Sequence, residues 1–246
     1  MTKKVALVTG ASSGIGAAVT LQLADCGYAI MAAGRDTERT ASLCNKSDNI
    51  RTWVGDLSGA DACTELVAAC AAAFGRLDLL VNNAGIYLAA NAENTSDDLW
   101  SRTMAINLHA PFYLSRAAIP HLRKTEGVIL NIASDWGISG GKDAVAYCTS
   151  KGGLVLMTKA MALDHAHEKI RINAICPGDV ETPMLYQEGD ARGLNPQAAV
   201  LAADAESPTG RVTTADEVAA LVVFLASDNA AQITGAAIPI DGGNTA

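Results

Sequence analysis

Short apolar segments alternate with longer helical stretches along the whole chain. Strand-like apolar runs occupy residues 4–9, 28–33, 50–55, 77–83, 127–134, 170–176 and 236–240. Between them, the pattern predicts helices that open at Gly14 and near Thr37, and others over 59–74, about 96–124, through 147–151 and near 214–226. Continuous apolar runs of this length indicate strands buried on both faces, as in a parallel sheet covered by helices. The alternation therefore predicts a doubly wound α/β fold.

One stretch departs from this alternation. Residues 184–212 carry two prolines, several small residues and charges of both signs, which predicts an irregular segment. It is either an ordinary surface excursion or a substrate lid. Its place after the carboxyl end of a predicted strand favours the lid, because open sheets bind ligands there. Since no other composition break or repeat occurs, we expect one domain over residues 1–246, with the lid at about 184–212.

Composition and charge narrow the function. Half of the 246 residues are apolar, which is ample for a buried core. The formal net charge of −8 and the lack of basic clusters argue against nucleic acid as a partner. No apolar run reaches the ~18 residues of a membrane helix, and the first run is too short for a signal peptide, so we expect no membrane association. The six cysteines and four histidines lack metal-ligand spacing, which predicts reduced thiols, a cytoplasmic location and no metal site.

A glycine-rich turn, "VTGASSGIG", follows the first predicted strand and opens the first predicted helix. Gly10, Gly14 and Gly16 form GxxxGxG, which differs from the GxGxxG of the standard dinucleotide fingerprint. The physics is shared, because missing β-carbons let the chain turn sharply and let a diphosphate approach the backbone. The helix start adds unpaired N–H groups and a positive dipole end. This turn predicts a nucleotide-phosphate site.

The stretch "AYCTSKGG" places Tyr147 and Lys151 four residues apart, on one helix face. A simple surface pair is one interpretation. The other is general acid–base chemistry, for which the tyrosine pKa of about 10 must fall to ~7, at about 4 kcal/mol. A cation at ~5 Å in an effective dielectric of ~20 supplies about 3 kcal/mol, so Lys151 has roughly the required strength. Ser134, at the end of a predicted strand, can hydrogen-bond the reacting oxygen.

Several motifs together resemble one family. "TGASSGIG" at 9–16, "NNAG" at 82–85, "YCTSK" at 147–151, "PG" at 177–178 and the ending "TGAAIPIDGG" at 234–243 occur in the order and spacing of the classical short-chain dehydrogenases/reductases. Asn107 and Ser134 also match, and the similarity spans nearly the whole chain. The resemblance implies a Rossmann-type domain with a seven-stranded parallel sheet in the order 3-2-1-4-5-6-7, helices on both faces and NAD(P)-dependent oxidoreductase activity.

The resemblance also implies roles for individual residues. The catalytic residues would be Asn107, Ser134, Tyr147 and Lys151. Lys151 would in addition bind the nicotinamide ribose, and Asn107 would hold a water in a proton relay. A core polar group that distorts its helix is the alternative interpretation of Asn107.

The same resemblance places the cofactor against several turns. We expect cofactor contacts from Gly10, Ser12, Ser13, Gly14, Ile15, Gly16, Arg35, Asp56, Leu57, Asn83, Ala84, Gly85, Tyr147, Lys151, Pro177, Gly178, Val180 and Thr182. Gly34 occupies the position where NAD-preferring members usually carry aspartate, and Arg35 follows it, so NADP is favoured over NAD. Asp36 could repel a 2′-phosphate and supports the opposite preference.

The substrate is less well defined. We expect Ser134, Trp136 and Tyr147 to contact it, with Trp136 as an apolar wall. The favoured substrate is a small polar secondary alcohol or ketone, such as a sugar, polyol or hydroxy acid derivative. The alternatives are a 3-oxoacyl-[acyl-carrier-protein] reductase and a non-catalytic nucleotide-sensing module, which would be expected to lack one of the catalytic residues. The family commonly forms homotetramers, and the apolar helix after Lys151 predicts the same assembly here.

Overall fold

The computed structural model describes residues 3–246, and seven strands within them form one sheet in the order β3-β2-β1-β4-β5-β6-β7. Every neighbouring pair of strands is parallel. The strands are β1 (Val5–Thr9), β2 (Ala29–Gly34), β3 (Ile50–Val54), β4 (Leu79–Asn82), β5 (Val128–Ile132), β6 (Arg171–Pro177) and β7 (Ala237–Ile240). The predicted fold class and strand order are confirmed.

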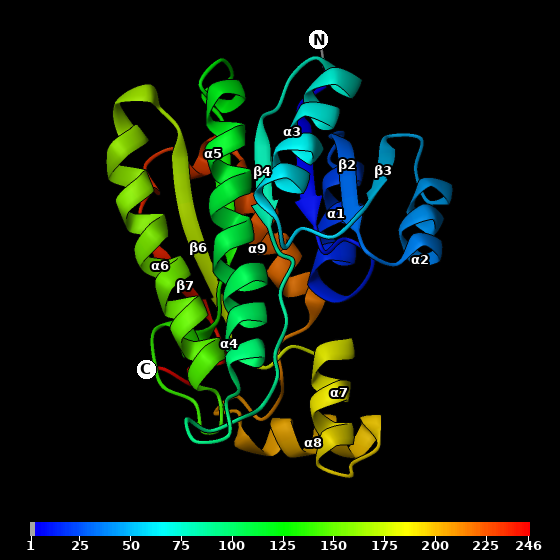
Figure 1. The fold of residues 1–246 in the computed structure, drawn as a ribbon. Coiled ribbons are helices and arrows are strands. Elements are labelled where there is room, and N and C mark those ends of the chain that lie inside the picture. Colours follow the sequence, from blue (N-terminus) through cyan, green and yellow to red (C-terminus); the bar gives the residue numbers. More distant parts are fainter. Residues whose placement is uncertain (1–2) are drawn as a thin grey trace.

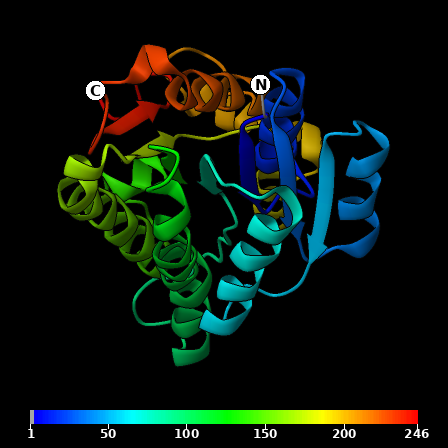
Figure 2. The same ribbon diagram turned by 90° about the horizontal axis from the view of Figure 1, so that it is seen from above.

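Helices cover both faces of the sheet (Figures 1 and 2). One face carries α1 (Gly14–Asp25) and α9 (Ala215–Ala226), which pack together, and the other carries α3 (Ala60–Phe74), α5 (Ala110–Leu122) and α6 (Val145–His165). The short α2 (Thr37–Ser42) lies beside β3 at the sheet edge. No helix in residues 3–246 has the length and apolarity needed to cross a membrane.

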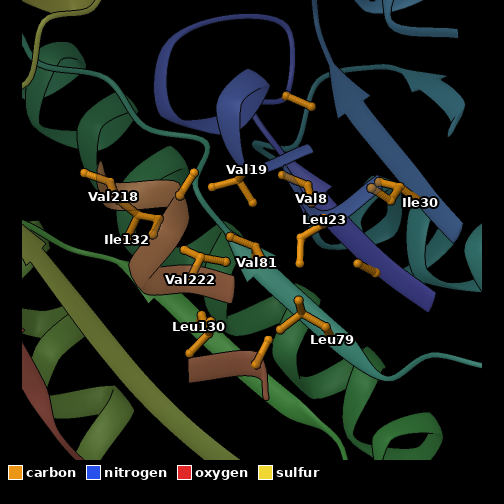
Figure 3. Packing of buried hydrophobic residues seen from close by; sticks show 14 of the residues in the cluster. Val8, Val19, Leu23, Ile30, Leu79, Val81, Leu130, Ile132, Val218 and Val222 are labelled. Carbon is orange, nitrogen blue, oxygen red and sulfur yellow. The ribbon is translucent and has the colours of Figure 1, made fainter. Parts of the chain in front are cut away.

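Successive side chains along a strand pack into two separate hydrophobic cores, one on each face of the sheet. Leu7 of β1 packs toward the α3 and α5 side, whereas its neighbour Val8 packs toward α1 and α9. Figure 3 shows Val8 close to Val19 of α1, with Val222 of α9 in the same cluster. These side chains are fully buried, which stabilises the fold by about 1.5–3 kcal/mol for each large aliphatic residue. Helices thus pack against both faces of the sheet, and this packing fixes the positions of the strand ends.

Residues 184–212 are not irregular, and this expectation was wrong. They contain most of α7 (Pro183–Ala191) and all of α8 (Pro196–Glu206). The two prolines that suggested loop structure stand at helix starts or beyond helix ends, where proline is tolerated. Asn195 caps α8 by accepting a hydrogen bond from the Ala198 backbone N–H at 2.9 Å, and the alanine-rich run that follows favours helix. The two helices lie beneath the carboxyl edge of the sheet (Figure 1).

The long helical stretch predicted over about 96–124 contains an irregularity. It comprises α4 (Asp97–Met104) and α5, joined by a π-helical turn at Ala105–His109. Such turns are rare and frequently occur at functional sites. Asn107 lies within this turn, beside the carboxyl edge of the sheet.

Candidate active site

A cleft of about 390 Å³ opens at the carboxyl edge of the sheet. The turns after β1, β2, β4, β5 and β6 contribute to its walls, together with α6 and α7. All the predicted site residues line this cleft except Gly16, Asp56 and Asn107. Residues that are widely separated in the sequence therefore meet in one place.

The glycine turn after β1 forms a cradle that side chains would fill. Gly10 and Gly14 adopt left-handed backbone angles, with φ of +64° and +51°. A β-carbon on Gly16 would collide with the Gly10 carbonyl oxygen. Gly16 therefore allows the helix start to pack closely under the turn, although it does not itself line the cleft. Asn83 holds the turn from the β4 side, because its Nδ2 donates to the Thr9 carbonyl oxygen at 2.9 Å. The close backbone and the adjoining helix start fit the diphosphate of a dinucleotide.

Two arginines line the cleft beyond β2, Arg35 in the turn after the strand and Arg39 in α2. Arg35 was predicted, whereas Arg39 was missed, although its place one helical turn later could have indicated it. Asp36 caps α2 by accepting from the Arg39 backbone N–H at 2.9 Å, and its second oxygen lies 3.4 Å from Arg39 Nε. The Asp36 charge is thus engaged with α2. Gly34 is tightly enclosed, since a β-carbon there would collide with Thr40 Oγ1.

The turn after β3 supplies Leu57 to the cleft, while Asp56 stands beside it. The Asp56 carboxylate accepts a hydrogen bond from the Ser58 backbone N–H at 2.7 Å. This bond is the main cause that holds the Asp56 pKa below its ordinary value. Asp56 therefore stabilises the turn before α3, and its contact with the cofactor stays a prediction.

Ser134, Tyr147 and Lys151 meet beneath the cleft. Ser134 follows β5 and caps a short 3-10 turn at Asp135–Gly137. Lys151 is buried, donates a hydrogen bond to the Ile132 carbonyl oxygen at 2.8 Å, and places Nζ 5.7 Å from the centre of the Tyr147 ring. The two α6 side chains thus lie on the same side of the helix, as their spacing predicts.

Burial dominates the acidity of both α6 groups. It raises the pKa of Tyr147 well above its ordinary value, and the hydrogen bond with Ser134 only partly opposes this rise. It lowers the pKa of Lys151 to about 8. Burial thus penalises the charged form of each group, and the help that Lys151 gives to the acidity of the phenol stays a prediction. Nζ also lies beside the ring and is bonded to a carbonyl.

Asn107 is completely buried and makes three hydrogen bonds. Its Oδ1 accepts from the Ile86 N–H at 2.9 Å, and its Nδ2 donates to the Ile86 carbonyl at 2.9 Å and to Ser150 Oγ at 3.1 Å. A β-carbon on Gly85 would lie 3.5 Å from both Asn107 Oδ1 and Lys151 Nζ, so Asn107 stands next to the lysine. These contacts fit the interpretation as a core polar group at a helix distortion, and the water relay stays a prediction.

The far end of the cleft is aromatic and acidic. Tyr87, Trp136 and Tyr147 form a triangle, with ring centres 5.7, 5.1 and 6.2 Å apart. Asp179 and Glu188 line the same end and were not singled out from the sequence. Burial raises the pKa of each carboxyl group. The charge of Asp135 raises the Asp179 pKa further, and the charge of Asp179 raises the Glu188 pKa further. This end can enclose a small molecule against Ser134 and Tyr147, and it repels anions.

Comparisons with known proteins cover almost the full chain. A family model described as enoyl-(acyl carrier protein) reductase matches residues 10–245. A meso-2,3-butanediol dehydrogenase of Serratia marcescens is 37% identical over 248 residues, covering 99% of this chain and 95% of that protein. A 3-oxoacyl-[acyl-carrier-protein] reductase of Thermotoga maritima is 35% identical, with 98% and 97% coverage. A solved structure of an actinorhodin polyketide ketoreductase variant with NADPH superposes with a TM-score of 0.93 at 32% identity, with 98% and 97% coverage.

Proposed function

We propose that this chain, which belongs to the short-chain dehydrogenase/reductase family, is an NADP-preferring oxidoreductase of small polar secondary alcohols and ketones. The observation that carries the proposal is the meeting of Ser134, Tyr147 and Lys151 between the glycine cradle and the aromatic triangle. The nicotinamide cofactor, when bound, supplies or accepts the hydride at the reacting carbon. The residues of the chain supply the proton chemistry and the shape of the site.

Tyr147 is the group that exchanges a proton with the reacting oxygen. In oxidation its phenolate oxygen accepts the hydroxyl proton of the alcohol, and in reduction its O–H returns a proton to the forming alkoxide. Ser134 hydrogen-bonds the same oxygen and stabilises its developing charge. The ammonium group of Lys151 stands beside the ring and favours the phenolate.

The preference for NADP is supported by Arg35 and Arg39, which both line the cleft and offer guanidinium groups that pair well with a 2′-phosphate. Replacing one arginine removes a charge-assisted hydrogen bond of about 1.5–3 kcal/mol, so Arg39→Ala should raise the KM for NADP+ by roughly tenfold or more. The KM for NAD+ should stay unchanged, because NAD+ lacks that phosphate. Lys46→Ala, an exposed cation just beyond α2, is the control. Equal effects on both cofactors, or a lower wild-type KM for NAD+, would defeat the proposal.

A small alcohol is favoured by the size and charge of the far end of the cleft. The second candidate, reduction of 3-oxoacyl groups on an acyl carrier protein, is supported by the family description and by the Thermotoga relative. An acidic carrier with its phosphate-bearing arm would approach two carboxylates, Asp179 and Glu188, in a protein of net charge −8. Repulsion therefore argues against this candidate.

A turnover assay separates these functions. Nicotinamide absorbance is followed with meso-2,3-butanediol, a reducing sugar, 3-hydroxybutyrate and acetoacetyl-[acyl-carrier-protein], with Tyr147→Phe as the control. We expect the highest kcat/KM for a neutral alcohol and at least a thousandfold loss in Tyr147→Phe. Faster turnover of the carrier-bound ketone would favour the second candidate. Cofactor binding without any turnover would indicate a nucleotide-sensing module.

We also propose that residues 184–212 act as a lid. In its first helix, Met184, Leu185 and Glu188 line the cleft, so α7 lies against the substrate end. Hydrogen exchange of α7 should slow at least severalfold when substrate and cofactor are added together. Unchanged exchange in that ternary complex would contradict a lid.

A homotetramer is proposed from the outer face of α6. Leu156 and Leu163 are 67% and 82% exposed there, and packing against a second copy would remove this apolar surface from water. Light scattering at micromolar concentration should give four times the chain mass, and Leu163→Asp should reduce it. A wild-type monomer would refute this assembly.

Each cysteine within residues 3–246 is a free thiol, which supports a cytoplasmic location that fractionation of expressing cells can test.

A further inference from the structure

Asp135 is a buried carboxylate that the proposed chemistry does not use. It follows Ser134 directly, is 5% exposed, and separates the catalytic cleft from a second cavity of about 270 Å³. Among the ion pairs of residues 3–246, none involves Asp135. A carboxylate buried without a cation is held only if hydrogen-bond donors compensate its charge.

Three donors surround Asp135. Its Oδ1 accepts from Ser134 Oγ at 2.9 Å and from the Trp136 backbone N–H at 2.7 Å. Its Oδ2 accepts from Asn244 Nδ2 at 2.8 Å. All three partners donate, so both carboxylate oxygens of Asp135 act as acceptors. Asn244 comes from the turn after β7, which Asp241 closes by accepting from Thr245 Oγ1 at 2.6 Å.

The hydroxyl of Ser134 has a single proton, and here that proton points to Asp135. The same hydroxyl oxygen accepts from the Trp136 N–H at 3.1 Å. Tyr147 draws on the same hydroxyl, because a hydrogen bond with Ser134 lowers the phenol pKa, and a proton given to Tyr147 is no longer given to Asp135. Asp135 therefore competes with the reacting oxygen for the serine proton, and its negative charge stands close to the phenol.

We propose that Asp135 and Asn244 are a positioning pair that sets the direction of the Ser134 hydroxyl during proton transfer at Tyr147. Asp135 draws the serine proton away from the cleft, and Asn244 moderates that pull by neutralising part of the carboxylate charge. The inference rests on the proposed role of Tyr147 as the group that exchanges the substrate proton. Neither Asp135 nor Asn244 needs to touch the substrate.

Other charged and titratable groups face this pair, and all of them remain in the variants below. Those around the Tyr147 phenol are Lys151 and Cys148 on α6, Tyr87 on the loop after β4, and Asp135 itself. Those lining the second cavity around Asp135 are Lys142, Asp179, Glu206, Arg211 and Asp241. Differences between variants and wild type therefore report the changed residue alone.

The test is a pair of substitutions with effects of opposite sign. Alcohol oxidation needs the Tyr147 phenolate, so kcat/KM rises with pH through its apparent pKa. Asp135→Asn removes a negative charge beside the phenol and should shift that profile to lower pH by about one unit. Asn244→Ala leaves the carboxylate less compensated and should shift the profile to higher pH by a few tenths of a unit. Asn229→Ala, an exposed asparagine with no role in the cleft, is the control and should not move it.

A purely structural role for the pair predicts a different result, in which kcat falls in both variants and the apparent pKa stays fixed. That result, or shifts in the same direction, overturns the inference. The profile is measured with meso-2,3-butanediol or with the alcohol of the panel above that turns over fastest.

A second readout does not depend on activity. The ¹³Cζ resonance of Tyr147, identified by its loss in Tyr147→Phe, responds to whether the phenol oxygen donates to or accepts from Ser134. It should move in Asp135→Asn and stay in place in Asn229→Ala. If the wild type oxidises no alcohol, the proposed function fails, and this resonance still decides the inference: no movement in Asp135→Asn overturns it.

Discussion

Lys151 should make the stability of the protein rise with pH in the alkaline range. Its ammonium group is 4% exposed, and burial lowers its pKa from the ordinary 10.5 to about 8. In the unfolded chain Lys151 titrates near 10.5, so between pH 8 and 10.5 the unfolded state binds more protons. Stability therefore increases with pH across this window of about 2.5 units (10.5 − 8). At about 1.36 kcal/mol per unit, the full gain is about 3 kcal/mol.

The assay isolates this gain by subtraction. Urea unfolding of wild type and Lys151→Met, which keeps the apolar stem and removes the charge, is measured at several pH values from 7.5 to 10 at one protein concentration. Other titrating groups cancel in the difference between the two proteins. The stability of wild type relative to the variant should rise by about 2 kcal/mol between pH 8 and pH 10.

The control is Lys159→Met, which removes an exposed lysine from the same helix. The difference in unfolding free energy between wild type and this variant should not change with pH. A flat difference for Lys151→Met as well would refute the argument that burial depresses its pKa. A fall with rising pH would show that the lysine gains a partner in the folded state instead.

Two further substitutions test the architecture of the site. Gly16→Ala places a methyl group against the Gly10 carbonyl and should raise the KM for the cofactor at least tenfold and lower Tm. Gly59→Ala meets open space but replaces the N-cap of α3, so it should lower Tm slightly and leave that KM unchanged. Asp78 is 7% exposed and accepts from the Val5 N–H at 2.8 Å, so Asp78→Ala should destabilise the sheet by about 3 kcal/mol in urea unfolding. An unchanged unfolding midpoint for Asp78→Ala would contradict that estimate.

The sheet was predictable because its signals are local and repeated. Runs such as 5–9 and 128–132 are apolar at four of their five positions, and all five are buried, as expected for a strand covered on both faces. The glycine turn was equally readable, since Gly10 and Gly14 do adopt the left-handed angles that no other residue takes easily. The strand order came from the family resemblance and not from the pattern itself.

The rest depended on facts that a sequence does not display. The prolines near residues 196 and 208 indicated a loop, but proline at a helix start is compatible with helix, and the alanines between them favoured α8. Burial, which is a property of the fold, is the largest influence on the Tyr147 pKa, and the spacing of Tyr147 and Lys151 does not reveal it. The bond between Asp135 and Asn244 joins residues 109 positions apart, and no spacing rule connects them.

The two halves of the site are synthesised at different times, because the cofactor-binding strands precede the catalytic residues along the chain. Residues up to 83 already supply β1 to β4, the glycine turn and the Asn83 side chain that braces it. Ser134, Tyr147 and Lys151 arrive later, on the far side of β4. Domains generally fold as units, with N-terminal domains first during synthesis. The cradle residues are thus made before the catalytic residues, but both belong to one sheet, and the later strands are needed before that sheet is complete.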